Sequence, residues 1–167
     1  MLFRKVILKG EDVSLLLERK AKKDTKSDWL PAHYFFILDK NKKKVGVCDL
    51  RLGHNENSYY GGNIGYRVFE EDRGNRYAAK ACLLLFSYAR SLGMEYVIIT
   101  CDPDNLASKR TCEILGGELL EITELPEDHV MREGGSTHKC IFRYDLTQEN
   151  SLDGQQSISE TSCKERP

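Results

Sequence analysis

A short polar stretch, Asp72-Arg73-Gly74-Asn75-Arg76-Tyr77-Ala78, holds the residue types best suited to binding an anion. It lies between a predicted strand and a strongly amphipathic segment that predicts a long helix. Small or flexible residues at such a junction allow backbone N–H groups to point outward, and a helix adds about half a positive charge at its N-terminus. The sequence therefore favours a phosphate or pyrophosphate site here. The alternative is that Gly74 only turns the chain and that Arg73 is solvated.

Other phosphate-binding and metal-binding patterns fit the sequence poorly. The Walker A pattern, G-x-x-x-x-G-K-[ST], is absent. The run Gly61-Gly62-Asn63-Ile64-Gly65 is rich in glycine like a dinucleotide fingerprint, but it enters a predicted strand instead of leaving one. The six cysteines form no C-x-x-C pair and the four histidines show no H-E-x-x-H spacing, so we expect no metal site. Buried, reduced thiols in a cytosolic protein are the simpler interpretation of the cysteines.

The segments around this stretch predict an α+β domain. We expect helices over residues 11–23, 77–92 and 105–115, and strands over residues 3–9, 34–38, 45–52, 60–69, 96–101, 118–123 and 139–146. The helix over 77–92 has the clearest pattern, because apolar residues recur every three or four positions and Gly93 follows as a C-terminal glycine. The strand over 96–101 lacks polar alternation, which is typical of a strand covered on both faces.

Length and charge limit the remaining possibilities. A chain of 167 residues suits one domain, which we place at residues 1–146. Residues 147–167 contain few apolar side chains, so we expect a disordered polar tail. The 25 Lys and Arg residues nearly balance the 26 Asp and Glu residues, which argues against a nucleic-acid partner. No apolar run is long enough for a membrane helix or a secretory signal, so we expect a cytoplasmic protein with no membrane partner.

Residues 65–117 resemble the GCN5-related N-acetyltransferase (GNAT) superfamily. The run Arg73-Gly74-Asn75-Arg76-Tyr77-Ala78 is similar to the family's pyrophosphate loop, R/Q-x-x-G-x-G/A, and the long helix and buried strand after it are similar too. The runs Asn105-Leu106-Ala107-Ser108 and Glu113-Ile114-Leu115-Gly116-Gly117 resemble the family's N-x-x-S…E-x-L-G-F segment. The resemblance implies a GNAT-like mixed, mostly antiparallel central sheet flanked by helices, which splays between the fourth and fifth predicted strands, 60–69 and 96–101.

The resemblance also implies acetyl-CoA as co-substrate, with no metal. Its pantetheine arm would bind the backbone of the strand at 67–69 as an added strand does, and its pyrophosphate would rest on the loop at 73–78. Asn105 would reach it from the next helix, or would serve only as an N-cap; Ser108 would touch it or face solvent. The implied cofactor-binding residues are Arg67, Val68, Phe69, Arg73, Gly74, Asn75, Arg76, Tyr77, Ala78, Asn105 and Ser108.

The reaction implied by the resemblance is direct attack of a primary amine on the thioester. Such an amine is protonated near neutral pH, with a pKa of about 10.4 for a lysine or about 7.7–8.0 for an α-amino group. A base must therefore take its proton, directly or through water. We predict Tyr66, Asn63 and Asp49 as catalytic candidates. Tyr60, Asp102 and His54 are further candidates, and each of the six also has a structural interpretation as a packed ring, a cap or a solvated charge.

Two positions depart from the family pattern. Arg76 stands where the loop usually has glycine, which restricts its φ, although its guanidinium could pair with a phosphate. Cys112 stands where many members place a tyrosine that protonates the leaving thiolate. The resemblance therefore supplies no general acid for this chain.

Three functions remain open from the sequence. The first, which we favour, is an N-acetyltransferase acting on a small amine or on a protein or peptide amine. The second is a catalytically inactive domain that binds acyl-CoA for regulation, which the missing tyrosine at position 112 suggests. The third is a protein-interaction module that uses the basic cluster at residues 19–26. A homodimer is compatible with each of them.

Overall fold

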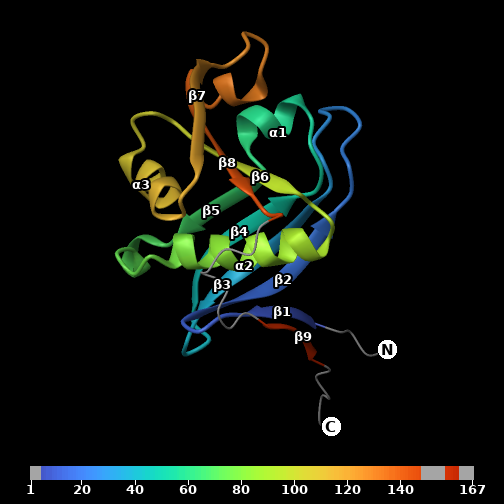
Figure 1. The fold of residues 1–167 in the computed structure, drawn as a ribbon, viewed down its shortest axis with the longest axis vertical. Coiled ribbons are helices and arrows are strands. Elements are labelled where there is room, and N and C mark those ends of the chain that lie inside the picture. Colours follow the sequence, from blue (N-terminus) through green and yellow to red (C-terminus); the bar gives the residue numbers. More distant parts are fainter. Residues whose placement is uncertain (1–4, 148–156, 162–167) are drawn as a thin grey trace.

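The computed structural model describes residues 5–147 and 157–161, which form two antiparallel sheets (Figure 1). The larger sheet contains β1 (Lys5–Lys9), β2 (Val13–Ala21), β3 (Ala32–Asp39), β4 (Lys44–Arg51), β5 (Ile64–Val68) and β9 (Ser157–Thr161). Its strand order is β5-β4-β3-β2-β1-β9. The smaller sheet contains β6 (Tyr96–Cys101), β7 (Glu118–Glu124) and β8 (His138–Asp145), in the order β6-β8-β7.

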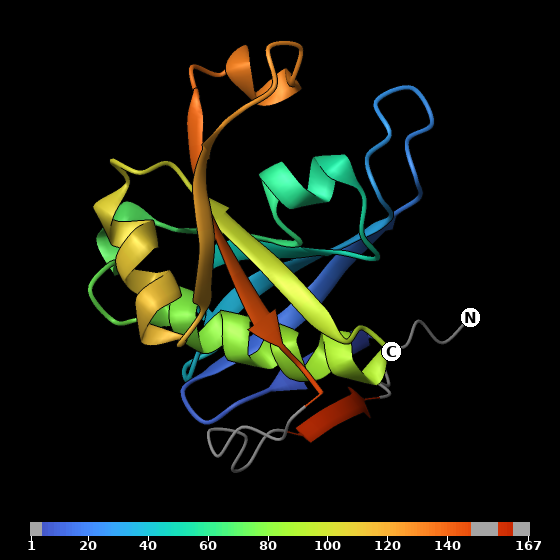
Figure 2. The same ribbon diagram turned by 45° about the horizontal axis from the view of Figure 1, so that its top comes forward.

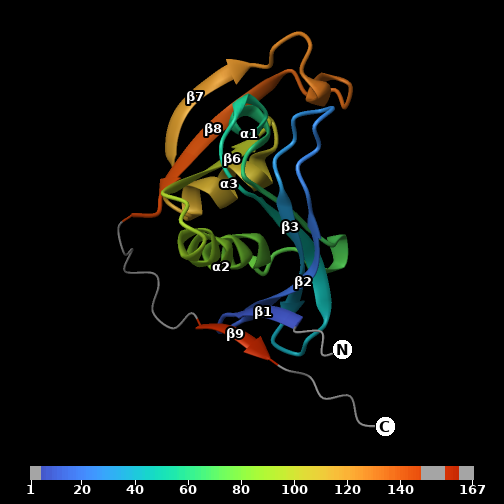
Figure 3. The same ribbon diagram turned by 90° about the vertical axis from the view of Figure 1, so that its right-hand side faces the viewer.

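Helix α2 (Tyr77–Ser91) lies between the two sheets and crosses the inner face of the larger one (Figure 3). Its buried side chains Ala81, Leu85 and Ala89 belong to the same core as Leu15 of β2 and Ile99 of β6. The other helices are α1 (Glu56–Gly61) and α3 (Leu106–Ile114), with short 3-10 turns η1 (Glu70–Asp72) and η2 (Val130–Arg132). None of the described helices is both long and apolar enough to cross a membrane. The predicted α+β, GNAT-like fold class is confirmed.

The two sheets separate between β5 and β6 (Figure 2). They are joined at the start of β5, where Asn63 N–H donates to the carbonyl of Ile98 at 2.7 Å and Ile98 N–H donates to Asn63 Oδ1 at 2.9 Å. Beyond this point no strand pairing links β5 to β6 in the described ranges. The predicted split between strands 60–69 and 96–101 is therefore observed, and these are the fifth and sixth strands of the fold.

The helix that we predicted over residues 11–23 is wrong, because this segment forms β2. Val13 and Leu15 are buried on one face, and β2 pairs with both β1 and β3. The run Leu15-Leu16-Leu17 fits the apolar face of a helix as well as a strand. Pairing with β1 on one side and β3 on the other favours the strand, in which alternate residues are buried. A bulge between Leu17 and Arg19 interrupts the pairing with β3.

The strand predicted over residues 60–69 is too long at its start, because α1 occupies Glu56–Gly61. Asn55 caps this helix: its Oδ1 accepts from Ser58 N–H at 2.9 Å, and Ser58 Oγ accepts from Asn55 N–H at 2.9 Å. This reciprocal capping box stabilises a helix that begins before the residues that we assigned to the strand.

The predicted disordered tail contains one described element. Residues Ser157–Thr161 form β9, which pairs with β1 in antiparallel register. These five residues therefore have regular structure. The other residues of the tail from position 148 onward lie outside the described residues, and the domain boundary at 146 stays a prediction.

Candidate active site

A cavity of about 650 Å³ lies between the end of β5, the loop before α2, and α3. Every predicted cofactor-binding residue except Phe69 lines it. The other lining residues are Tyr66, Asp72, Ala107, Arg110, Thr111 and Ile114. Three segments that are distant in the sequence therefore meet around one space of the size that small-molecule sites have.

The N-terminus of α2 opens onto this cavity. The helix begins at Tyr77 with no side-chain cap, and its first internal bond runs from Lys80 N–H to the carbonyl of Arg76, at 3.0 Å. The N–H groups of Tyr77 and Ala78 have no hydrogen-bond acceptor among the described residues. Free amides at a helix start, together with the helix dipole, bind phosphate oxygens well.

Arg76 adopts a left-handed backbone conformation, which favours glycine. Its φ and ψ are 57° and 26°, in the left-handed region, and Gly74 also has a positive φ of 88°. This conformation costs a non-glycine residue about 1–2 kcal/mol. The loop therefore keeps its turn in spite of the substitution, and the Arg76 guanidinium is placed at the cavity.

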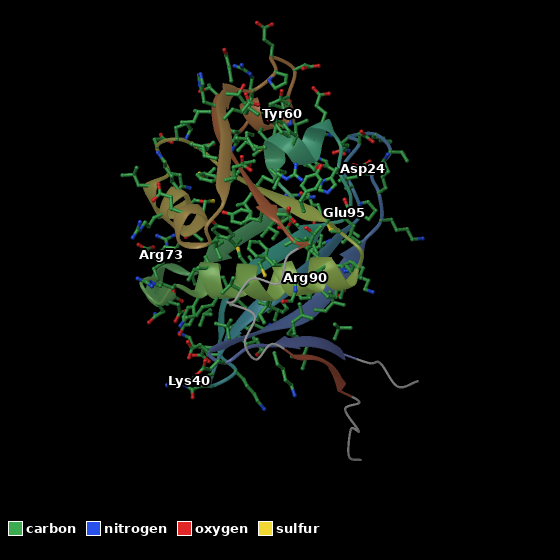
Figure 4. The ribbon with its side chains drawn as sticks, in the orientation of Figure 1. Asp24, Lys40, Tyr60, Arg73, Arg90 and Glu95 are labelled. Atoms are coloured by element: carbon green, nitrogen blue, oxygen red, sulfur yellow. The ribbon has the colours of Figure 1, made fainter. Side chains whose placement is uncertain are left out.

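The cavity wall is strongly basic. Its four arginines are Arg67, Arg73, Arg76 and Arg110. Figure 4 shows Arg73 at the N-terminal end of α2, on the side of α3. The one acidic lining residue, Asp72, is bound by Lys43, with Nζ 2.6 Å from Oδ1. Such an excess of positive charge suits a ligand that carries several phosphate charges.

The open edge of β5 offers backbone groups to the cavity, and not all of them are those that we predicted. Phe69 N–H donates to the carbonyl of Val45 at 2.9 Å, so the backbone of Phe69 faces β4. Because alternate residues of an antiparallel strand face the same neighbour, the backbone of Arg67 also faces β4. This pairing disfavours backbone binding by Arg67 and Phe69, which stays a prediction. The free edge is formed by Tyr66 and Val68.

Tyr66 brings a phenol into the cavity. Its hydroxyl lies 2.8 Å from Ser108 Oγ. Burial raises the pKa of Tyr66 well above its ordinary value, so the phenol is a proton donor at neutral pH. Cys112 is fully buried and does not line the cavity.

Asn105 and Ser108 lie at the start of α3, where they are hydrogen-bonded to each other. Asn105 Oδ1 accepts from Ser108 N–H at 3.1 Å, so Asn105 is the N-cap of the helix. Its Nδ2 group makes no hydrogen bond within the described residues and lies at the cavity. Ser108 is half-buried and holds the Tyr66 hydroxyl.

Asn63 has a structural role, and the catalytic role that we predicted for it stays a prediction. Its side chain is fully buried. Nδ2 donates to the carbonyls of Arg51 and Gly53 at 3.2 and 2.8 Å, and Oδ1 accepts from Ile98 N–H. Its backbone N–H and Oδ1 join the two sheets through Ile98, whereas its Nδ2 and carbonyl bind β4 and the loop after it. Asn63 lines neither the 650 Å³ cavity nor the second cavity beside Asp49.

Asp49 lines a second cavity, of about 330 Å³, on the other face of the larger sheet. Its Oδ2 lies 3.5 Å from Arg51 Nη2, and neither carboxylate oxygen accepts a hydrogen bond from a described residue. Burial raises the pKa of Asp49, although Arg51 and Arg19 oppose this shift. Sequence reasoning missed two residues of this cavity, Glu18 and Tyr34, because only the pairing of β2, β3 and β4 brings them beside Asp49.

The further candidates lie outside both cavities. Asp102 Oδ1 is bound by Lys139 Nζ and by Ser136 Oγ, each at 2.6 Å. The His54 ring stacks on Tyr96 with centroids 3.9 Å apart. Tyr60 lies on α1, beside the segment between β7 and β8 (Figure 4). Among the described residues, no group of three Cys, His, Asp or Glu side chains is placed to hold a metal ion.

Comparison with known proteins identifies the family. Residues 9–118 match the family model described as the acetyltransferase (GNAT) domain. No curated protein matches the sequence. Among solved structures, the microcin C7 self-immunity acetyltransferase MccE in complex with acetyl-CoA and AMP is 25% identical, with a TM-score of 0.55 over 68% of this chain and 61% of that chain.

Two further structures share the fold. A GNAT-family acetyltransferase from Bacillus anthracis is 15% identical, with a TM-score of 0.61 over 85% of this chain and 99% of that one. RimL, a ribosomal L7/L12 alpha-N-protein acetyltransferase, is 20% identical, with a TM-score of 0.53 over 69% of this chain and 70% of that one. This chain thus spans less than two thirds of MccE but nearly all of the Bacillus protein. Since the family model covers well over half of its length, the chain belongs to the GNAT acetyltransferases, which use acetyl-CoA as their acyl donor.

Proposed function

We propose that this protein transfers the acetyl group of acetyl-CoA to a primary amine by direct attack, with the cofactor held in the 650 Å³ cavity. One observation carries the proposal: the free amides of α2, four arginines and the unpaired edge of β5 all face this one cavity. A phosphate group, a peptide-like arm and a thioester need different partners. The start of α2 offers free amides to the phosphate groups, the edge of β5 offers backbone groups to the arm, and Tyr66 offers a phenol to the thioester.

The two ends of the cavity bind different parts of acetyl-CoA. The amides of residues 74–78 bind the pyrophosphate, and the guanidinium of Arg76 adds charge there. The backbone of Val68 and Tyr66 binds the pantetheine arm as a neighbouring strand would. Acetyl-CoA supplies an activated acyl group, and the Tyr66 phenol, held by Ser108, gives a proton to the departing sulfur.

Two measurements test this proposal. Calorimetry of the full chain with acetyl-CoA should give saturable binding that falls steeply with salt, because the contacts are to phosphate. A thiol-release assay with a panel of primary amines should give turnover, with the acetylated amine detected by mass spectrometry. Absence of acetyl-CoA binding would end the proposal.

The catalytically inactive acyl-CoA-binding domain is the alternative outcome of the same pair of measurements. It predicts binding without turnover on any amine. The buried Cys112 favours this alternative, since it leaves α3 without a phenol. The phenol of Tyr66 at Ser108 favours catalysis. The five described cysteines are free thiols, which supports a reducing compartment such as the cytoplasm.

A further inference from the structure

We propose that the 330 Å³ cavity on the outer face of the larger sheet receives the acceptor amine as a primary ammonium, with Asp49 as its binding carboxylate and proton acceptor. The inference rests on the proposed function and names the acceptor class for it. The cavity is lined by Glu18, Tyr34, Phe35, Val47, Cys48, Asp49, Tyr66 and Arg67.

The Asp49 carboxylate is placed to accept hydrogen bonds that the protein does not supply. Its side chain is 16% exposed, and Oδ2 is buried with no hydrogen-bond donor. Arg51, at 3.5 Å, is too far for a good hydrogen bond. The ion pair with Arg51 therefore leaves Oδ2 without a hydrogen-bond donor, and an ammonium group is the ligand that supplies both a donor and a positive charge.

Gly65 gives this carboxylate its position. Asp49 pairs with Gly65 across β4 and β5, and a Cβ on Gly65 would lie 2.6 Å from Asp49 Oδ1. The carboxylate therefore leans over β5 into the space that a side chain would fill. Since β5 is the edge strand, Asp49 lies just across it from the cofactor cavity.

The two cavities adjoin. Tyr66 and Arg67 line both of them, and they are consecutive residues of β5. A cofactor arm on the free edge of β5 and an amine at Asp49 would thus approach each other across one strand. No side chain of Gly65 stands between them.

A second acid completes the cavity. Glu18 lies in β2 at the bulge between Leu17 and Arg19, where pairing with β3 shifts. Bulges re-aim side chains, and this one brings Glu18 to the cavity. Tyr34 is held from the other side by the Arg19 guanidinium, 3.6 Å from its ring centroid.

The size of the cavity and its two carboxylates, Asp49 and Glu18, indicate the class of acceptor. A volume of about 330 Å³ is at the small end of ligand sites, so it holds an unbranched amine chain or one chain terminus. The charged and titratable groups that face Asp49 are Arg51 of β4, Glu18 and Arg19 of β2, Tyr34 of β3 and Arg67 of β5. The two acids receive an ammonium, and Arg67 suits a carbonyl oxygen of the acceptor.

The proton and electron balance is complete with these groups. The ammonium loses one proton to Asp49, its nitrogen lone pair forms the C–N bond at the thioester carbonyl, and the nitrogen of the adduct then loses its second proton to solvent. The C–S bond breaks, its electron pair stays on sulfur, and the Tyr66 phenol supplies the proton that makes the thiol. Asp49 and Tyr66 return to their starting states through solvent.

The test compares Asp49→Asn with wild type in calorimetry and in steady-state turnover. The acceptors are butylamine, 1,4-diaminobutane and a tripeptide with a free N-terminus, so that the source of the ammonium is distinguished. We expect an unchanged Kd for acetyl-CoA and a fall of kcat/KM of about 10²–10⁴-fold on the preferred acceptor. The acid limb of the pH profile of kcat/KM should vanish in Asp49→Asn.

Two further variants sharpen the result. Gly65→Ala keeps the charge but displaces the carboxylate, so it should raise KM for the amine at least fivefold. Glu95→Gln is the matched control, because Glu95 is exposed at the far end of β6 (Figure 4) and should change nothing. Wild-type kcat/KM in both Asp49→Asn and Gly65→Ala would overturn the inference. Failure of wild type to bind acetyl-CoA would instead overturn the proposed function.

Discussion

The Tyr66 hydroxyl lies 2.8 Å from Ser108 Oγ, so a phenol carried by β5 reaches the first turn of α3. The family pattern places a tyrosine at position 112 on this same helix, where the chain has a buried cysteine. The phenol is therefore supplied from the opposite wall of the cavity. The cavity therefore contains a phenol even though position 112 holds a cysteine.

Tyr66→Phe should remove the proton donor and leave the cofactor site intact. We expect kcat to fall about 10²–10³-fold, since general acid catalysis is of this size. The Kd for acetyl-CoA should stay within twofold of wild type. Stopped-flow thiol release and calorimetry measure the two quantities. Tyr96→Phe, at a ring outside the cavity, is the control, and equal kcat for both variants would contradict the role of Tyr66.

Val68→Pro should weaken acetyl-CoA binding without unfolding the protein. Its N–H points to the free edge of β5, where proline is tolerated, so only the bond to the pantetheine arm is lost. We expect the Kd to rise about fivefold to tenfold, which corresponds to a hydrogen bond of about 1 kcal/mol. Arg67→Pro removes a bond to β4 and should lower the melting temperature much more. The reverse order of the two melting temperatures would show that the edge is assigned wrongly.

Arg76→Gly and Arg76→Ala separate backbone strain from charge in the phosphate loop. Glycine relieves the positive φ of 57°, so the free energy of unfolding should rise by about 1 kcal/mol. Alanine keeps the strain and should leave stability near wild type. Both variants lose the guanidinium, and the Kd for acetyl-CoA should rise by a similar factor in each. If Arg76→Ala binds acetyl-CoA as tightly as wild type does, then the guanidinium of Arg76 plays no part in binding.

Asp49→Asn should stabilise the protein at neutral pH. Burial raises the pKa of Asp49 in the folded state, so the folded protein holds this proton more tightly than the unfolded chain does. The wild type is therefore most stable below the unfolded pKa of about 3.9 and loses stability as pH rises through the raised folded pKa. The advantage of the variant should grow across this range to about 1–3 kcal/mol. Thermal unfolding between pH 3 and pH 8 measures it, and an advantage independent of pH would contradict the shift.

The stability of Asp49→Asn also serves as a control for the measurement of its turnover. If Asp49→Asn is more stable than wild type at pH 7, its loss of turnover does not come from unfolding. Stability and activity are then opposed at one carboxylate, which is expected where a charge is buried for function.

Several elements follow directly from the sequence. The sequence predicts the helix α2 and the strand β6 within one residue of their bounds. The apolar residues of α2 recur every three or four positions, which fits only a helix, and the short continuous apolar run of β6 fits only a buried strand. The loop at 72–78 was found for a similar reason, since its basic and small residues precede a strong helix. Such features depend on neighbours in the sequence and need no tertiary context.

The errors arise where local patterns are ambiguous. The three consecutive leucines of β2 fit two periods, and only pairing with β1 and β3 decides between them. Helix α1 could have been found from Asn55 and Ser58, but Tyr59 and Tyr60 favoured a strand. The cavity beside Asp49 could not be found at all, since the pairing of Asp49 with Gly65 depends on register between strands.

The hydrogen bonds of Asn63 to Ile98 mark the point from which the two sheets diverge. On one side of it the two sheets are tied by the backbone and the side-chain amide of Asn63, and on the other side they diverge around the cofactor cavity. The angle of this divergence sets how far α3, which follows β6, lies from β5 across the cofactor cavity. A substitution at Asn63 should therefore alter acetyl-CoA binding from a position that does not line the cavity.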